Sequence, residues 1–108
     1  MRVVALVSDL MDRSRISAAL PEATFVADVG AITGTSTVSI TVVIDLTRHG
    51  DAVATIRQAS PDAFIVAFGS HVDADEMLAA RAAGADRVLP RSRFFRDPAA
   101  AVAPEHKS

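Results

Sequence analysis

The chain has 108 residues, half of them hydrophobic, which is enough for one hydrophobic core and too little for a second domain. Its net charge of −2 argues against nucleic acid or an anionic membrane surface as a partner. The absence of cysteine excludes disulfides, thiolate zinc sites and cysteine nucleophiles.

Short apolar runs alternate with amphipathic runs along the chain. The apolar runs predict strands over residues 2–7, 24–29, 41–47, 63–68 and 86–89. The amphipathic runs predict helices over residues 10–20, 52–59, 74–83 and 95–102. Strands and helices that alternate in this way predict an α/β domain, in which helices cover both faces of a parallel sheet of about five strands.

The sequence also predicts one loop, the limits of the domain and the inward face of one helix. Residues 30–37 are rich in Gly, Ser and Thr, so we expect a loop there, with at most a turn of helix. We expect the domain to span residues 1–103, and residues 104–108 to form a disordered tail. On the helix over 74–83, the inward positions are expected to be Met77, Leu78 and Ala82.

The apolar run that begins after Arg2 is too short for a signal sequence, and an acid follows it closely. Nowhere does the sequence contain the roughly 20 consecutive apolar residues that span a bilayer. We therefore expect a cytoplasmic protein without a membrane segment.

Asp45 lies near the end of the most strand-like stretch of the chain, 41–47. A carboxylate is costly to bury unless it is paired or has a function. The carboxyl ends of parallel strands are also where open α/β sheets place their binding sites. Asp45 is therefore the first candidate functional residue.

The chain resembles the receiver domain of bacterial response regulators. The resemblance rests on Asp45 after the third strand, the 69–73 loop after the fourth, and the segment GADRVLPR over residues 84–91. It implies a three-layer, flavodoxin-like fold, in which the helix between the second and third strands is shortened or missing here. In that family, the aspartate after the third strand accepts a phosphoryl group. An acidic pair binds Mg²⁺, and a Thr or Ser and a Lys contact the phosphoryl oxygens.

Two residues match this pattern. Asp45 corresponds to the phosphoryl acceptor, and Asp9 corresponds to one member of the acidic pair. The resemblance thus implies a remnant Mg²⁺ site at Asp9 and Asp45. We expect no bound cofactor unless the protein is phosphorylated, in which case Mg²⁺ would be needed.

The other positions depart from the pattern. Ser8 stands where the second acid belongs, so one anionic metal ligand is missing. Gly69 stands where the hydroxyl residue belongs, with Ser70 one residue later as a substitute contact. Arg91 stands in place of the lysine, so a planar guanidinium replaces a compact ammonium group. The chain therefore resembles a degenerate receiver domain, or pseudo-receiver.

Three functions remain open. The favoured one is a non-catalytic signalling or regulatory module that binds a protein partner, or a second copy of itself, through Arg91, Arg93, Phe94 and Phe95. In this case we expect Asp45 to form an inert ion pair with Arg91. The second is a stand-alone response regulator, phosphorylated on Asp45 by a histidine kinase. The third is a domain that binds a small molecule or nucleotide in a crevice near Asp9, Asp45 and Ser70.

Other polar groups carry weaker signals. Ser70, His71 and Asp73 are neighbours in sequence, which seldom form a catalytic triad, and Asp73 is better placed to cap a helix. The three histidines, at positions 49, 71 and 106, lack the spacing of metal ligands.

Overall fold

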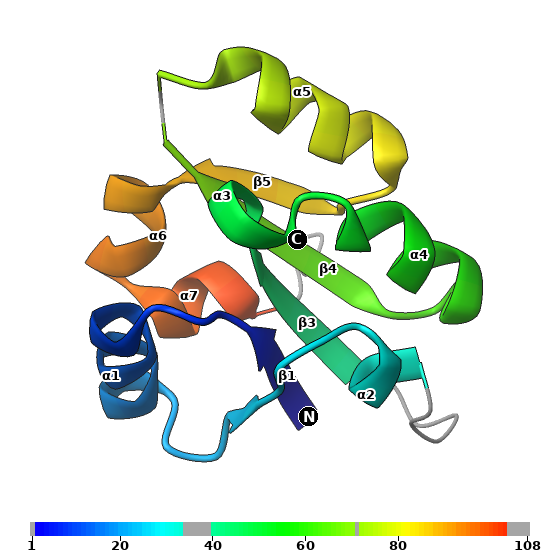
Figure 1. Ribbon diagram of the computed structural model, residues 1–108. Coiled ribbons are helices and arrows are strands. Elements are labelled where there is room, and N and C mark those ends of the chain that lie inside the picture. The colour runs from blue at the N-terminus through cyan, green and yellow to red at the C-terminus, as the bar shows by residue number, and fades with distance from the viewer. Residues whose placement is uncertain (1, 34–39, 71, 104–108) are drawn as a thin grey trace, which may run out of the picture.

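The protein is described here by a computed structural model that places residues 2–33, 40–70 and 72–103. Its centre is a five-stranded parallel sheet with the strand order β2-β1-β3-β4-β5 (Figure 1). The strands are β1 (Arg2–Leu6), β2 (Thr24–Phe25), β3 (Ile40–Asp45), β4 (Phe64–Gly69) and β5 (Arg87–Pro90). This is the order of flavodoxin-like folds, so the predicted fold class is confirmed.

The helices form one layer on each side of the sheet (Figure 1). One layer contains α1 (Leu10–Ala19), α6 (Arg91–Arg96) and α7 (Pro98–Val102). The other contains α2 (Gly30–Thr33), α3 (Leu46–His49), α4 (Ala52–Ala59) and α5 (Ala74–Ala83). In the described chain, none of these helices is both long and apolar enough to cross a membrane.

The central strand β3 shows why the sequence specifies this arrangement. All six of its residues are buried, because helices cover both faces of the sheet. Val42 and Ile44 point into the core beneath α2 to α5, whereas Val43 points into the core beneath α1, α6 and α7. Alternate residues of a strand face opposite sides, so a continuous apolar run fits this position.

The helix between β2 and β3 is shortened, as expected. This helix, α2, has four residues, Gly30–Thr33. Residues 34–39 lie outside the described part of the chain, as do the predicted tail over 104–108 and two of the histidines, His71 and His106.

Three predicted boundaries were wrong. The second strand is only Thr24–Phe25. The third strand stops at Asp45, because the Asp45 side chain caps α3 and helix begins at the next residue. The predicted helix over 95–102 is two helices, divided at Asp97; Asp97 caps α7 and Pro98 occupies its first position.

The inward positions of α5 were also partly wrong. Met77 packs against the core, but Leu78 is 65% exposed and Ala82 is exposed as well. Ala80 is the buried residue of this helix. An exposed leucine is left on α5, beside Arg81 one helical turn further along.

Candidate functional site

The candidate site lies at the carboxyl ends of β1, β3 and β4, where Asp45 is the last residue of β3. Its side chain is buried, with 2% exposure. One carboxylate oxygen accepts a hydrogen bond of 3.0 Å from the backbone N–H of Thr47, which caps α3. Burial raises the pKa of Asp45 and outweighs both this hydrogen bond and the positive charge of Arg91, which lower it. Asp45 therefore acts here as a helix cap that is costly to ionise.

Arg91 pairs with Asp12, not with Asp45. Its two terminal nitrogens donate to the two Asp12 carboxylate oxygens, at 3.0 and 2.7 Å. Asp12 is 4% exposed, and this bidentate hydrogen bonding raises the pKa of Arg91. The predicted ion pair between Asp45 and Arg91 was therefore wrong. Arg91 reaches across to α1 because a buried carboxylate there would otherwise lack a counter-charge.

Aromatic rings hold Arg91 in this position. Its guanidinium carbon lies 5.4 Å from the ring centroid of Phe68 and 5.2 Å from that of Phe95. Phe68 and Phe94 stack with centroids 4.7 Å apart, and the edge of Phe95 meets both rings. A guanidinium fixed by a carboxylate and two rings is not available to turn toward Asp45 without breaking these contacts.

Asp9, the predicted partner of Asp45 in a metal site, also serves as a cap. It accepts a hydrogen bond of 3.0 Å from the backbone N–H of Asp12 at the start of α1, and this bond lowers the pKa of Asp9. Ser8, which precedes it, lies 2.8 Å from the imidazole Nε2 of His49. This contact ties the end of β1 to α3.

The acids at this end of the sheet do not assemble a metal site. Within the described ranges, no three His, Asp or Glu side chains are grouped so that they could hold an ion. Mg²⁺ prefers an octahedral set of oxygens held by carboxylates, and of the nearby acids Asp12 is occupied by Arg91. The residues present therefore do not fit the Mg²⁺ that the resemblance implies.

Gly69, where the resemblance implies a hydroxyl residue, lies beside Glu76. A side-chain carbon at Gly69 would lie 3.5 Å from a carboxylate oxygen of Glu76 and 3.4 Å from Leu46. That Glu76 oxygen is buried and has no hydrogen-bond partner among the residues that the structure describes, and burial is the main cause of the raised pKa of Glu76. An acid thus occupies the space next to Gly69, while Ser70 lies further out and accepts from the backbone N–H of Val72 at 3.4 Å.

The predicted interaction surface over 91–95 is only partly exposed. Phe94 is completely buried in the core, so its assignment to the surface was wrong. Phe95 is half-buried, and Arg93 is exposed. Two neighbouring helical residues point about 100° apart, so only one of the two phenylalanines can face the sheet.

A basic groove adjoins this segment. It has a volume of about 550 Å³ and runs between α5, β5, α6 and α7. Its charged lining residues are Arg81, Asp86, Arg87, Arg93, Arg96 and Asp97. Four arginines and two aspartates give this surface a net positive charge on a chain whose total charge is −2.

Sequence reasoning missed Asp12, His49 and Glu76. Asp12 carries one usable signal, because it is an acid in the first turn of α1, where the helix dipole favours a negative charge. His49 and Glu76 are recognisable only once α3 and α5 are placed beside the strand ends.

No protein-family model matches the chain, and no curated protein matches it. Solved structures do. A response regulator from Thermotoga maritima superposes with a TM-score of 0.69 at 14% identity, over 95% of this chain and 98% of that one. A CheY-like protein (tadZ) from Pseudomonas aeruginosa PAO1 superposes with a TM-score of 0.68 at 21% identity, over 85% of this chain and 87% of that one. Together with the strand order, these matches show that the chain has the receiver-like α/β fold.

Proposed function

We propose that this protein is a non-catalytic signalling module of receiver-like fold, which acts by protein–protein interaction without being phosphorylated. The observation that carries the proposal is the bidentate pair between Arg91 and Asp12. In the family it resembles, the residue at this position contacts the phosphoryl group. Here its charge is neutralised by a carboxylate of α1.

The surroundings of Asp45 support the same conclusion. A buried carboxyl with a raised pKa is a poorer nucleophile toward a phosphodonor, because its ionised form is disfavoured. Glu76 places a further carboxylate next to Gly69, where a phosphoryl oxygen would need a donor. Neither acid supplies the positive charge that an incoming phosphoryl group needs.

The basic groove is the surface that we propose for the partner. Arg93 and Arg96 on α6 and Arg81 on α5 are exposed, and none forms an ion pair with any residue in the described ranges. Leu78, 65% exposed, lies one helical turn before Arg81 on α5. An exposed apolar side chain one helical turn from an arginine of the groove suits an acidic protein surface that also carries an apolar residue.

The test is incubation with acetyl phosphate and Mg²⁺, followed by intact mass measurement. We expect no gain of mass in the wild type, because Asp45 is buried, the described residues form no metal site beside it, and Arg91 is paired with Asp12. A phosphoryl adduct that disappears in Asp45→Asn would contradict the proposal and support a phosphorylatable response regulator instead.

A further inference from the structure

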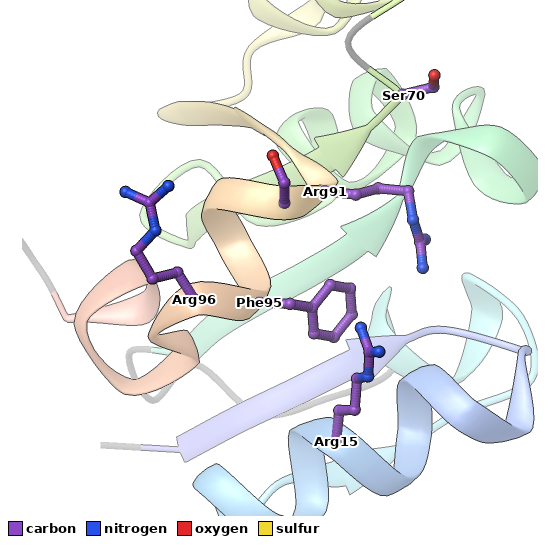
Figure 2. A pocket seen from close by; sticks show the side chains of 6 residues that line it. Arg15, Ser70, Arg91, Phe95 and Arg96 are labelled. Atoms are coloured by element: carbon purple, nitrogen blue, oxygen red, sulfur yellow. The ribbon is translucent and has the colours of Figure 1, made fainter.

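A second cavity lies between α1 and α6, outside the acidic site. Its volume is about 600 Å³, which is within the range of small-molecule sites. Its lining residues are Arg15, Ser70, Arg91, Ser92, Phe95 and Arg96 (Figure 2). They come from α1, from the end of β4 and from α6, so the cavity exists only in the folded chain.

The lining is strongly cationic. It includes three arginines, and the residues that form it contain no carboxylate. Asp12 neutralises Arg91 from outside the cavity. Arg15 and Arg96 are exposed and form no ion pair with any described residue, so two positive charges remain uncompensated. Several positive charges in one cavity make its electrostatic potential more positive, which favours the binding of an anion.

Part of this lining is held in place before any ligand binds. The guanidinium of Arg15 lies 5.4 Å from the ring centroid of Phe95, and that of Arg91 lies 5.2 Å from the same centroid. Figure 2 shows the Arg15 and Arg91 side chains reaching toward Phe95 from α1 and from the start of α6. Phe95 is itself fixed by edge contacts to Phe68 and Phe94. Groups held in this way lose little entropy on binding.

The chemistry of the lining selects among anions. Guanidinium groups match phosphate oxygens with two parallel hydrogen bonds, and the hydroxyls of Ser70 and Ser92 add further donors. We propose that this cavity binds a small molecule that carries two or more phosphate groups. Arg15 and Arg96 each contact one phosphate. Arg96 lines both this cavity and the basic groove. Arg15 lines only the cavity, and Arg81 and Arg93 line only the groove, so the site goes beyond the proposed protein interaction.

Isothermal titration of the full chain with pyrophosphate tests the proposal, with ADP and citrate as further probes. We expect saturable binding of pyrophosphate and ADP, and much weaker binding of citrate. Arg15→Gln and Arg96→Gln should each weaken pyrophosphate binding about tenfold or more, because each removes a charge-assisted hydrogen bond. Arg81→Gln removes the same charge outside the cavity and should change the affinity less than about twofold.

Tighter binding of ADP than of pyrophosphate indicates that the site also recognises the nucleoside, and equal or weaker binding of ADP indicates that it recognises the diphosphate alone. Both results support the site. Binding that does not saturate, citrate binding as tight as pyrophosphate binding, or an equal loss in Arg81→Gln would overturn it. If Arg15→Gln lowers the melting temperature strongly, Arg96→Gln decides alone, because Arg96 is exposed and forms no ion pair with the described chain.

Discussion

Asp45 combines an ionisable side chain with almost complete burial, and these two properties conflict. Its carboxylate is 2% exposed and receives a backbone hydrogen bond from Thr47. Burial disfavours the charged form, and the raised pKa shows that the single cap bond and the charge of Arg91 do not fully compensate. The residue is therefore better suited to end a strand and begin a helix than to attack a phosphodonor.

Asp45→Asn should stabilise the protein at pH 7. Because the pKa is raised in the folded state, the folded state binds the Asp45 proton more tightly than the unfolded state. The tighter binding of this proton stabilises the folded state fully when the pH is below the unfolded pKa of about 3.9. This stabilisation is lost as the pH rises through the folded pKa. Asparagine stays neutral and keeps an oxygen for the cap, so we expect a gain of about 1 kcal/mol at pH 7.

Urea unfolding at pH 7 and at about pH 3.5 measures this effect, since the gain should nearly vanish where the wild-type carboxyl is protonated in both states. A less stable Asp45→Asn at pH 7 would mean that the ionised carboxylate makes a favourable contact that the structure does not include.

At the scale of elements, the pair between Asp12 and Arg91 joins α1 to α6. The two residues are 79 positions apart, and their helices lie on the same face of the sheet. The pair also fixes the orientation of Arg91 over Phe68 and Phe95. It therefore connects the start of the chain, the end of β4 and the last helices in one cluster.

A double-mutant cycle on this pair should show strong coupling. Arg91→Ala leaves the Asp12 carboxylate buried without a partner and should cost about 3 kcal/mol of unfolding free energy. Asp12→Ala should cost less, about 2 kcal/mol, because Arg91 is partly exposed and can turn to water. The coupling energy should be about 1–3 kcal/mol.

Arg93→Ala is the matched control on the same helix, and it should change stability by less than about 0.5 kcal/mol because Arg93 is exposed. Additive losses in the cycle would show that the two side chains are not paired in solution.

A second cluster explains the segment 84–91 that carried much of the resemblance. Asp86 accepts hydrogen bonds from the backbone N–H of Ile65, at 2.8 Å, and from Arg57, at 2.5 Å. Arg57 also donates to the carbonyl of Gly84, whose φ of +122° few other residues adopt. This motif therefore fixes the turn between α5 and β5, and its role is structural.

On the scale of the whole molecule, the candidate acidic site and the clustered arginines lie on different surfaces. The carboxyl ends of β1 and β3 hold acids that act as helix caps. The positive charge instead gathers around α5, α6 and α7, in the basic groove and in the neighbouring cavity. The capping acids and the exposed arginines therefore lie on different surfaces of the molecule.

In-cell photo-crosslinking tests the groove as an interaction surface. A photoreactive residue in place of Arg93 should crosslink a protein, whereas the same residue in place of Arg15, on α1, should not. Leu78→Glu should abolish the crosslink, because it puts an acid one helical turn from Arg81, where it would repel an acidic partner.

A crosslink between two copies of the chain would identify the partner as a second copy. Equal crosslinking from both positions, or a crosslink that survives Leu78→Glu, would contradict the proposed surface.

The sequence by itself determined the architecture. Alternating apolar and amphipathic runs are local signals, and parallel strands with helical crossovers leave few ways to connect them. The same runs placed Asp45 at the end of the third strand and defined the helix over 74–83. The Gly-, Ser- and Thr-rich sequence over 30–37 predicted a loop with at most a turn of helix, and its described part contains the four-residue α2.

Only the tertiary structure decided what the side chains contact. The pairing of Arg91 with Asp12, the approach of Glu76 to Gly69, and the burial of Phe94 rather than Phe95 all join residues from different elements. These contacts depend on which side chains come within a few ångströms of one another when the helices pack on the sheet. Periodicity along the chain shows which face a residue takes, but it contains no information about the residue that comes to lie opposite.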